Sequence, residues 1–321
     1  MKKLYLIMVF LCLLILTLAQ ASIPKSRSVE FNYGVVLNNL PANASEVKIW
    51  LPYIPQMPYQ EIEEIKLTPD GIAKITQDRS YHNKILYYQF ESPQRPISID
   101  VHYKIRRYEF SNNFFHYIPE KTMHKDLNKY LRANKLVTLS PKIRQIAQEI
   151  TKGEKTTMGK AKAIYDYVFE NVSYDKNIPG WGNGDTERVC RLKAGNCTDF
   201  HSLFISLARA SDIPAKFVIG ASLPKDHEGE LKGYHCWAEF YDENIGWVPI
   251  DISEAWKDKA KKDYYFGTLN EDRIEFTQGR DIILEPAAHS EPLNYFVYPY
   301  IEINGQSFKD FQVSFKFKDE S

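Results

Sequence analysis

The first third of the chain alternates apolar and polar residues with the period of a β-strand. The alternation is clearest over residues 97–106, where every second side chain is apolar, so one face of that strand is expected to be buried. Shorter runs of the same character, separated by Pro, Asn and Gly, cover residues 29–36, 46–51 and 84–90. This pattern predicts an antiparallel β-sandwich over residues 22–122.

The pattern changes to that of helices after this region. Ser140 can cap a helix that begins at Pro141 and whose apolar stripe continues to Ile150. A second helix is expected over about 157–171. The stretch 176–188 is rich in Gly and contains Pro179, so it predicts a loop that leads to the next helix.

A third helix is predicted to begin at Cys197. Asn196 can be its cap, and Asp199 can complete a capping box three residues later. The helix carries a broad apolar stripe and is closed by Ile213-Pro214. Strand-like runs follow at residues 215–220, 234–241, 247–252, 295–303 and 308–317.

These elements together predict an α+β fold with more than one structural unit. A chain of 321 residues is longer than one hydrophobic core usually extends. We expect a signal peptide, an N-terminal β-sandwich, a central domain of helices and strands, and a C-terminal β extension. Their predicted bounds are 1–21, 22–122, 123–265 and 266–321.

Composition narrows the possible partners. Hydrophobic residues make up 44% of the chain and charged residues 26%, which is ordinary for a folded soluble protein. Basic and acidic side chains number 41 each, so the chain has no net charge to attract nucleic acid or anionic lipid. We therefore expect no nucleic-acid partner.

The N-terminus has the pattern of a secretory signal. Met1-Lys2-Lys3 precedes an apolar run over residues 4–18 and the small-residue sequence Ala19-Gln20-Ala21. A retained membrane anchor is the alternative, but a spanning helix needs about 20 apolar residues. We expect a periplasmic or secreted protein without stable membrane insertion once the signal is cleaved.

The mature chain would keep three cysteines, Cys190, Cys197 and Cys236, so at least one thiol stays free or pairs between chains. Cys197 lies at the predicted helix start, where backbone N–H groups and the helix dipole stabilise a thiolate. Asp199 would weakly oppose this effect. The structural alternative is a disulfide between Cys190 and Cys197.

A hairpin is predicted to bring His235 and Asp251 together. If Tyr241 pairs with Trp247 across the turn, His235 and Asp251 are diagonal neighbours on one face, about 7–8 Å apart. Cys236 then points to the opposite face, as a small buried residue. With a nearby thiol, such a pair suits nucleophilic catalysis, because the imidazole moves the thiol proton and the carboxylate orients the imidazole.

Three sequence blocks resemble bacterial transglutaminase-like proteins, within the papain-like superfamily. They are GNCTDFH at 195–201, GYHCWAE at 233–239 and GWVPID at 246–251. The resemblance covers about residues 139–265 and extends more loosely into the flanking β regions. It implies that residues 123–265 form a catalytic domain with an α+β core, in which a central helix packs on an antiparallel sheet. It also implies that Cys197 is the nucleophile, His235 the general base and acid, and Asp251 the orienting carboxylate.

Acyl transfer also needs an oxyanion hole, of which the Cys197 backbone N–H can supply one donor. Trp181 and Tyr174 are both candidates for the second donor, and each is equally consistent with a packing role. His201 is four residues after Cys197, a spacing that also occurs in metal sites. The chain has no Cys-x-x-Cys or His-Glu-x-x-His motif, so we expect neither a metal nor another cofactor.

The sequence therefore predicts an exported cysteine acyltransferase or hydrolase that acts on protein glutamine or peptide amides through a thioester. A cell-wall peptide is a candidate substrate because of the expected location. The alternative is a noncatalytic binding module that keeps the same fold, and a disulfide-stabilised structural protein is a third possibility.

Overall fold

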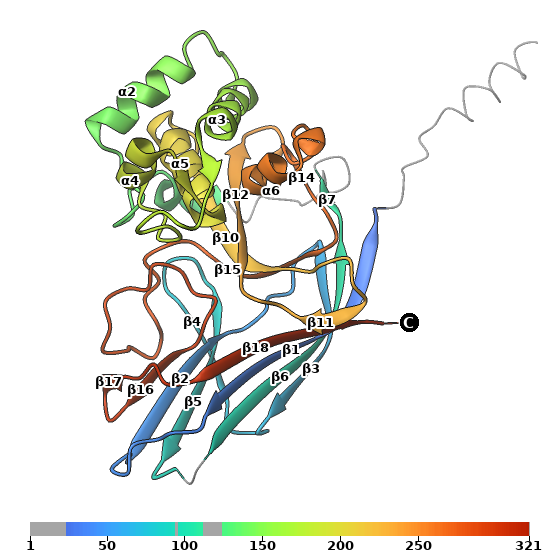
Figure 1. Ribbon diagram of the computed structural model, residues 1–321, viewed down its shortest axis with the longest axis vertical. Coiled ribbons are helices and arrows are strands. Elements are labelled where there is room, and N and C mark those ends of the chain that lie inside the picture. The colour runs from blue at the N-terminus through green and yellow to red at the C-terminus, as the bar shows by residue number, and fades with distance from the viewer. Residues whose placement is uncertain (1–23, 94–95, 112–123, 321) are drawn as a thin grey trace, which may run out of the picture.

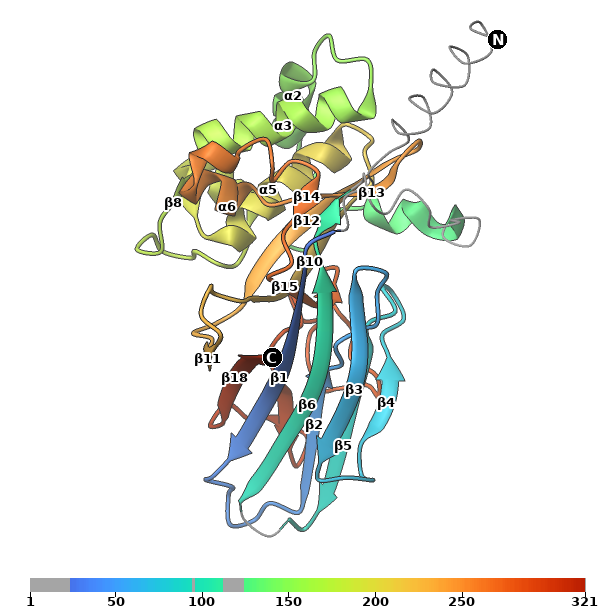
Figure 2. The ribbon, with the colours of Figure 1, turned by 90° about the vertical axis from the view of Figure 1, so that its right-hand side faces the viewer.

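A β-sandwich forms one end of the molecule. The computed structural model describes residues 24–93, 96–111 and 124–320. Two five-stranded sheets have the strand orders β11-β18-β1-β6-β3 and β17-β16-β2-β5-β4 (Figures 1 and 2). The bounds are β1 Ser26–Leu37, β2 Glu46–Pro52, β3 Gln60–Thr68, β4 Lys74–Gln77, β5 Lys84–Glu91, β6 Ile97–Tyr108, β11 Glu228–Glu230, β16 Tyr300–Ile303, β17 Gln306–Ser307 and β18 Gln312–Asp319.

The alternating strand predicted near residue 100 is confirmed as β6. Its apolar residues are buried and alternate with partly or fully exposed polar ones. They face the same core as the alternate residues of β1, with which β6 pairs in register, for example Phe31 opposite Tyr103. Period-two alternation is thus explained by one face of each strand packing inside the sandwich.

Strands from the C-terminus complete both sheets of the sandwich. β18 pairs with β1 over eight residue pairs, from Val29 opposite Asp319 to Val36 opposite Gln312. β16 pairs in the same way with β2. The region expected as a C-terminal extension is therefore built into the sandwich, and the chain between the two halves forms the second unit.

The second unit is a four-stranded antiparallel sheet, of order β13-β12-β10-β15, with helices on one face (Figure 1). Its sheet strands are β10 Ala215–Ser222, β12 His235–Asp242, β13 Gly246–Ile250 and β15 Arg273–Gln278. Its helices are α2 Pro141–Ile150, α3 Thr157–Asn171, α4 Thr186–Leu192, α5 Cys197–Ala210 and α6 Ile252–Lys257. Two-residue strands form two further pairs, β7 Phe110–Ser111 with β14 Thr268–Leu269 and β8 Ser173–Tyr174 with β9 Ala194–Gly195. The 3₁₀ helices are η2 His124–Tyr130 and η3 Lys259–Lys261.

The long helices agree closely with the sequence patterns. α2 is capped by Ser140, whose hydroxyl accepts a hydrogen bond from the Ile143 N–H, and α3 has the predicted bounds. The short helix α4 lies partly in the predicted loop and was missed. Asp185 caps this helix by accepting hydrogen bonds from the N–H groups of Glu187 and Arg188. The glycines just before Asp185 indicated a loop, so its capping role was not recognised.

The structure confirms the α+β class, with a helix packed on an antiparallel sheet and β regions on both sides of it in sequence. β15 comes from the segment assigned to the extension but pairs with β10 in the central sheet. The predicted domain bounds otherwise remain a prediction, and the predicted signal peptide lies outside the described residues. Within the described part of the chain, no helix has the length and apolar character to cross a membrane.

The C-terminal strand should be essential to sandwich stability. The buried Phe315 packs against the rings of Phe31, Tyr33 and Phe276. We predict that Phe315→Ala lowers the free energy of unfolding by about 3–5 kcal/mol, because it leaves a cavity among these rings. Urea unfolding followed by circular dichroism measures the loss. Substitution of the exposed neighbouring residue, Lys316→Ala, is the control. Equal losses of unfolding free energy in the two variants would contradict the assignment of β18 to the core.

Candidate active site

The start of α5 is fixed by reciprocal capping around Cys197. The Asn196 side chain accepts the Thr198 N–H at 2.9 Å, and the Asp199 carboxylate accepts the Asn196 N–H at 2.9 Å. Cys197 is the first residue of the helix and only 3% exposed. Its sulfur therefore lies where helix N–H groups and the helix dipole favour a negative charge.

Asp199 organises the loop in front of this helix. Its buried carboxylate also accepts the N–H groups of Gly182 at 2.7 Å and Gly184 at 3.1 Å, and it pairs with Arg188 at 2.5 Å. Four donors bind this carboxylate, and one of them is the positively charged Arg188. Arg188 therefore offsets the negative charge of Asp199, which was expected from the sequence to oppose the Cys197 thiolate. A Cβ on Gly195 would lie 2.1 Å from the Asp199 carboxylate, which explains a glycine there.

The predicted hairpin register is confirmed, because Tyr241 lies opposite Trp247. The strand, however, ends at Ile250, and the expected extension to residue 252 is wrong. Asp251 instead caps α6 by accepting the Glu254 N–H at 3.0 Å. The helix start holds the Asp251 carboxylate in place more firmly than an open strand end would.

The structure brings His235 and Asp251 into direct contact. His235 Nε2 lies 2.7 Å from Asp251 Oδ2, which leaves Nδ1 as the ring nitrogen available to the Cys197 thiol. Arg273, on β15, donates to the same carboxylate oxygen at 3.0 Å and is almost fully buried. Sequence reasoning missed Arg273, because 22 residues and three intervening elements separate it from Asp251.

Two further groups complete the surroundings of Asp251. The Ser253 hydroxyl donates to Asp251 Oδ1 at 3.0 Å, so each carboxylate oxygen has at least two polar neighbours. His201 Nε2 accepts the Ile252 N–H at 3.0 Å, and burial lowers the pKa of His201 to about 4. His201 is thus a neutral hydrogen-bonding residue behind the site. In the described ranges, no group of three or more His, Cys, Asp or Glu side chains is arranged to hold a metal.

The charges favour an ion pair between thiolate and imidazolium. A hydrogen bond from Cys236 and contacts with His235 hold the pKa of Cys197 well below its usual value, although burial opposes this. Burial alone would lower the pKa of His235, but the Asp251 carboxylate raises it to about 9. Burial also opposes the charge on Asp251, yet His235 and Arg273 hold the pKa of this carboxyl well below its usual value. Because Cys197, His235 and Asp251 titrate together, the proton is shared by the three groups and is not assigned to one of them.

Cys236 has a larger role than the small buried residue predicted from the sequence. It is fully buried, as expected, but its sulfur lies 3.6 Å from Thr198 Oγ1 and 3.8 Å from His201 Nδ1. Burial and the neighbouring Cys197 raise the pKa of Cys236 well above its usual value, so it remains a thiol donor. Cys190, Cys197 and Cys236 are all free, and the considered disulfide between Cys190 and Cys197 is absent.

The two oxyanion-hole candidates differ in their surroundings. Trp181 is 41% exposed, and its ring lies 5.6 Å from Lys176 Nζ. Tyr174 is half-buried, and its backbone pairs with Gly195, two residues before the thiol. Burial and then the negative charge of Cys197 raise the pKa of Tyr174.

Tyr234 is a second residue that sequence reasoning missed. Its hydroxyl lies 2.9 Å from Thr198 Oγ1 and accepts from Asn196 Nδ2 at 3.3 Å. These contacts flank Cys197 on both sides, and Tyr234 directly precedes His235 in the chain. The aromatic residue before the histidine was visible in the sequence block, but its hydrogen bonds to α5 depend on tertiary packing. They tie the β12 strand to the start of the helix.

Comparison with known families agrees with this geometry. Residues 144–252 match the model described as the transglutaminase-like superfamily. A solved structure of a candidate cysteine protease from Cytophaga hutchinsonii superposes with a TM-score of 0.60 at 15% identity, covering 92% of this chain and 98% of that one. The resemblance stated from the sequence blocks is confirmed, and the segment has the transglutaminase-like fold.

Two curated proteins are also similar. An uncharacterized protein of Haemophilus influenzae is 26% identical over 306 residues, which cover 83% of each chain. The uncharacterized YebA of Bacillus subtilis is 25% identical over 142 residues, covering 39% of this chain and 19% of YebA. The first match includes most of the sandwich as well as the central unit, because it spans most of the chain.

The pH dependence of thiol alkylation should report the ion pair. We expect iodoacetamide to label Cys197 at pH values well below the ordinary cysteine pKa of about 8.5, because the thiolate persists above its lowered pKa. His235→Ala should move the midpoint upward by about two pH units, since the cation is lost while burial remains.

The Cys197→Ser variant is the control for this labelling, which peptide mass spectrometry can localise. It retains Cys190, whose pKa is raised by burial, and Cys236, whose pKa is raised further. Identical alkylation profiles in the wild-type protein and His235→Ala would contradict the thiolate–imidazolium pair.

Proposed function

We propose that this chain, with its transglutaminase-like segment over residues 144–252, is an exported cysteine enzyme that cleaves or exchanges amide bonds through a thioester. The observation that carries the proposal is the pairing of His235 with Asp251 at 2.7 Å beside a thiol whose pKa is lowered at the start of α5. A module that only binds a partner would not need this charge arrangement.

In the first half of the reaction, the Cys197 thiolate attacks the amide carbonyl carbon and forms the C–S bond. The protonated His235 then gives its Nδ1 proton to the leaving nitrogen as the C–N bond breaks. An amine departs and a thioester remains on Cys197. Asp251 keeps the ring oriented through Nε2 and stabilises its positive charge.

In the second half, the neutral His235 removes a proton from an incoming amine or water. The new nucleophile attacks the thioester carbon, the C–S bond breaks, and Cys197 leaves as a thiolate next to the reprotonated imidazole. An amine acceptor gives a new amide and hence transfer, whereas water gives hydrolysis. The ion pair is restored in both cases.

The tetrahedral intermediates of both halves carry an oxyanion that needs two donors. The Cys197 backbone N–H, at the first position of α5, supplies one of them. For the second donor we favour the Tyr174 hydroxyl over Trp181. Tyr174 is half-buried and its backbone pairs with Gly195, two residues before the thiol, whereas the Trp181 side chain is 41% exposed.

The N-terminal sequence supports export to the periplasm or the medium, through the signal pattern over residues 1–21. In that location, protein glutamine and peptide amides are the available substrates. A cell-wall peptide is our preferred example, and this preference depends on the export signal alone.

Activity should depend on Cys197, and the products should show whether an amine or water accepts the acyl group. We predict that incubating the purified protein with peptide amides releases ammonia or a peptide amine, and that Cys197→Ala reduces the rate by at least about 10⁴-fold. Mass analysis with and without added glycine methyl ester distinguishes transfer from hydrolysis, since transfer adds the amine to the product.

The same assay tests the alternative of a noncatalytic module. Substrates should include glutamine-containing peptides, linear peptides and cell-wall muropeptides. If the wild-type protein forms no thioester and turns over none of them, while an amide-mimicking electrophile also fails to label Cys197, the binding module is favoured instead.

Removing the Tyr174 hydroxyl should slow catalysis without changing the ion pair. We predict that Tyr174→Phe lowers kcat by about 10²-fold, as loss of an oxyanion donor does elsewhere, while the pH profile of alkylation is unchanged. Trp181→Phe is the matched comparison and should have a small effect on kcat. The reverse order of effects would assign the donor to Trp181.

A further inference from the structure

A cavity of about 450 Å³ lies where the β-sandwich meets the central sheet. Its walls come from the β2–β3 connection, the β4–β5 connection with the start of β5, η2, β13 and β15. The volume is in the range of cavities that hold small molecules, which often lie between structural units. Neither Cys197 nor His235 nor Asp251 lines this cavity.

The cavity is separated from the thiol by the central sheet. Glu275 on β15 contributes to its wall and accepts a hydrogen bond from the Tyr59 hydroxyl of the sandwich at 2.8 Å. Tyr59 packs in a cluster with Trp237 and Val218, on the sheet face opposite α5. A ligand in the cavity would therefore bind without touching the catalytic groups.

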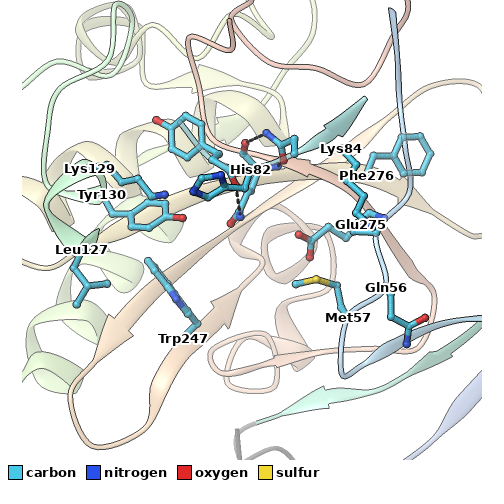
Figure 3. A pocket seen from close by; sticks show the side chains of 14 residues that line it. Gln56, Met57, His82, Lys84, Leu127, Lys129, Tyr130, Trp247, Glu275 and Phe276 are labelled. Carbon is cyan, nitrogen blue, oxygen red and sulfur yellow. Dashed lines mark hydrogen bonds between the residues drawn. The ribbon is translucent and has the colours of Figure 1, made fainter. Parts of the chain in front are cut away.

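The Glu275 carboxylate in the wall calls for a hydrogen-bond donor on a ligand. Figure 3 shows the Glu275 carboxylate pointing into the space between Tyr130 and Trp247 on one side and Met57 on the other. The Tyr59 hydroxyl donates to Glu275 Oε2, and the other oxygen of this carboxylate can accept a hydrogen bond from a ligand.

The charges of the wall argue against a strongly charged ligand. Lys129 and Lys84 also line the cavity, and Lys129 Nζ donates to the Ser80 carbonyl at 2.7 Å while keeping further protons. These two ammonium groups disfavour a cation. The Glu275 carboxylate, whose pKa burial and Glu239 raise to about 7, disfavours an anion whenever it is ionised. Ligand hydroxyl groups can accept hydrogen bonds from the lysine ammonium groups and donate to the Glu275 carboxylate.

Aromatic rings form the remaining part of the wall. The rings of Tyr81 and Tyr130 lie 6.0 Å apart, and the ring of Trp247 meets that of Tyr130 edge to face at 4.8 Å. The face of an aromatic ring is electron-rich and attracts weakly positive C–H groups. A saturated ring with C–H groups on its faces and hydroxyls at its edge therefore matches this cavity.

We propose that the cavity between the β-sandwich and the central sheet binds a neutral pyranose sugar. The C–H face of the sugar packs on Tyr130 and Trp247, and its hydroxyls donate to Glu275 and accept from Lys129. This binding site is separate from the proposed thioester chemistry and does not depend on it.

The test is a titration of the full chain with sugars, by isothermal calorimetry and saturation-transfer NMR. The probes are glucose, mannose, galactose and N-acetylglucosamine with their trisaccharides, and glucuronate and glucosamine serve as charged analogues. At least one neutral sugar should bind with a Kd of about 10 mM or tighter, and the charged analogues should bind more weakly. Saturation transfer should be strongest at the ring C–H protons.

Variants assign the binding to this cavity. Lys129→Met, which removes the donor, and Tyr130→Ala should each weaken sugar binding by about tenfold. Lys129→Met remains informative if Tyr130→Ala fails to fold, because the two side chains are similar in length. Cys197→Ser should bind sugar like the wild-type protein, even though it is inactive. The proposal is overturned if no neutral sugar binds at about 50 mM, or if folded Lys129→Met binds as tightly as the wild-type protein.

Discussion

The structure depends most on how one buried carboxylate is satisfied. Asp251 is fully inaccessible to solvent, and an ionised group in such a place is stable only when charges and donors surround it. Its partners come from β12, α6 and β15, and they include His235 and Arg273. The groups that stabilise this charge therefore also set the position and the protonation of the imidazole. Stability and reactivity have the same origin here.

A second buried carboxylate performs the corresponding task on the thiol side. Asp199 gathers two glycine N–H groups, Arg188 and the N–H of the helix cap, and so fixes the loop against α5. The two halves of the site are then joined by the Tyr234 hydroxyl and the Cys236 thiol, which both contact the first turn of α5. The thiol and the imidazole are thus positioned by rigid elements from opposite sides.

Local sequence patterns predicted the parts of the fold that local interactions determine. Capping residues and apolar stripes predicted α2, α3 and the start of α5, and turn length predicted the register between Tyr241 and Trp247. The patterns could not predict that Asp251 begins a helix, because a strand end and a helix cap share the same residue types. Arg273 was missed for a different reason. Its contact with Asp251 depends on the β10–β15 pairing, which no periodicity within either strand encodes.

The closing of the sandwich by its last strand affects the order in which the molecule can be assembled. Val29 lies opposite Asp319, so β1 obtains one of its neighbours only after β18 has been synthesised. The central helices and their sheet are formed largely from contacts nearer in sequence, and such contacts form faster. A growing chain would hold β1 with one open edge, a surface prone to pairing with other chains, until β18 is available. Delivery to another compartment before folding would postpone that exposure until both ends of the sandwich are present together.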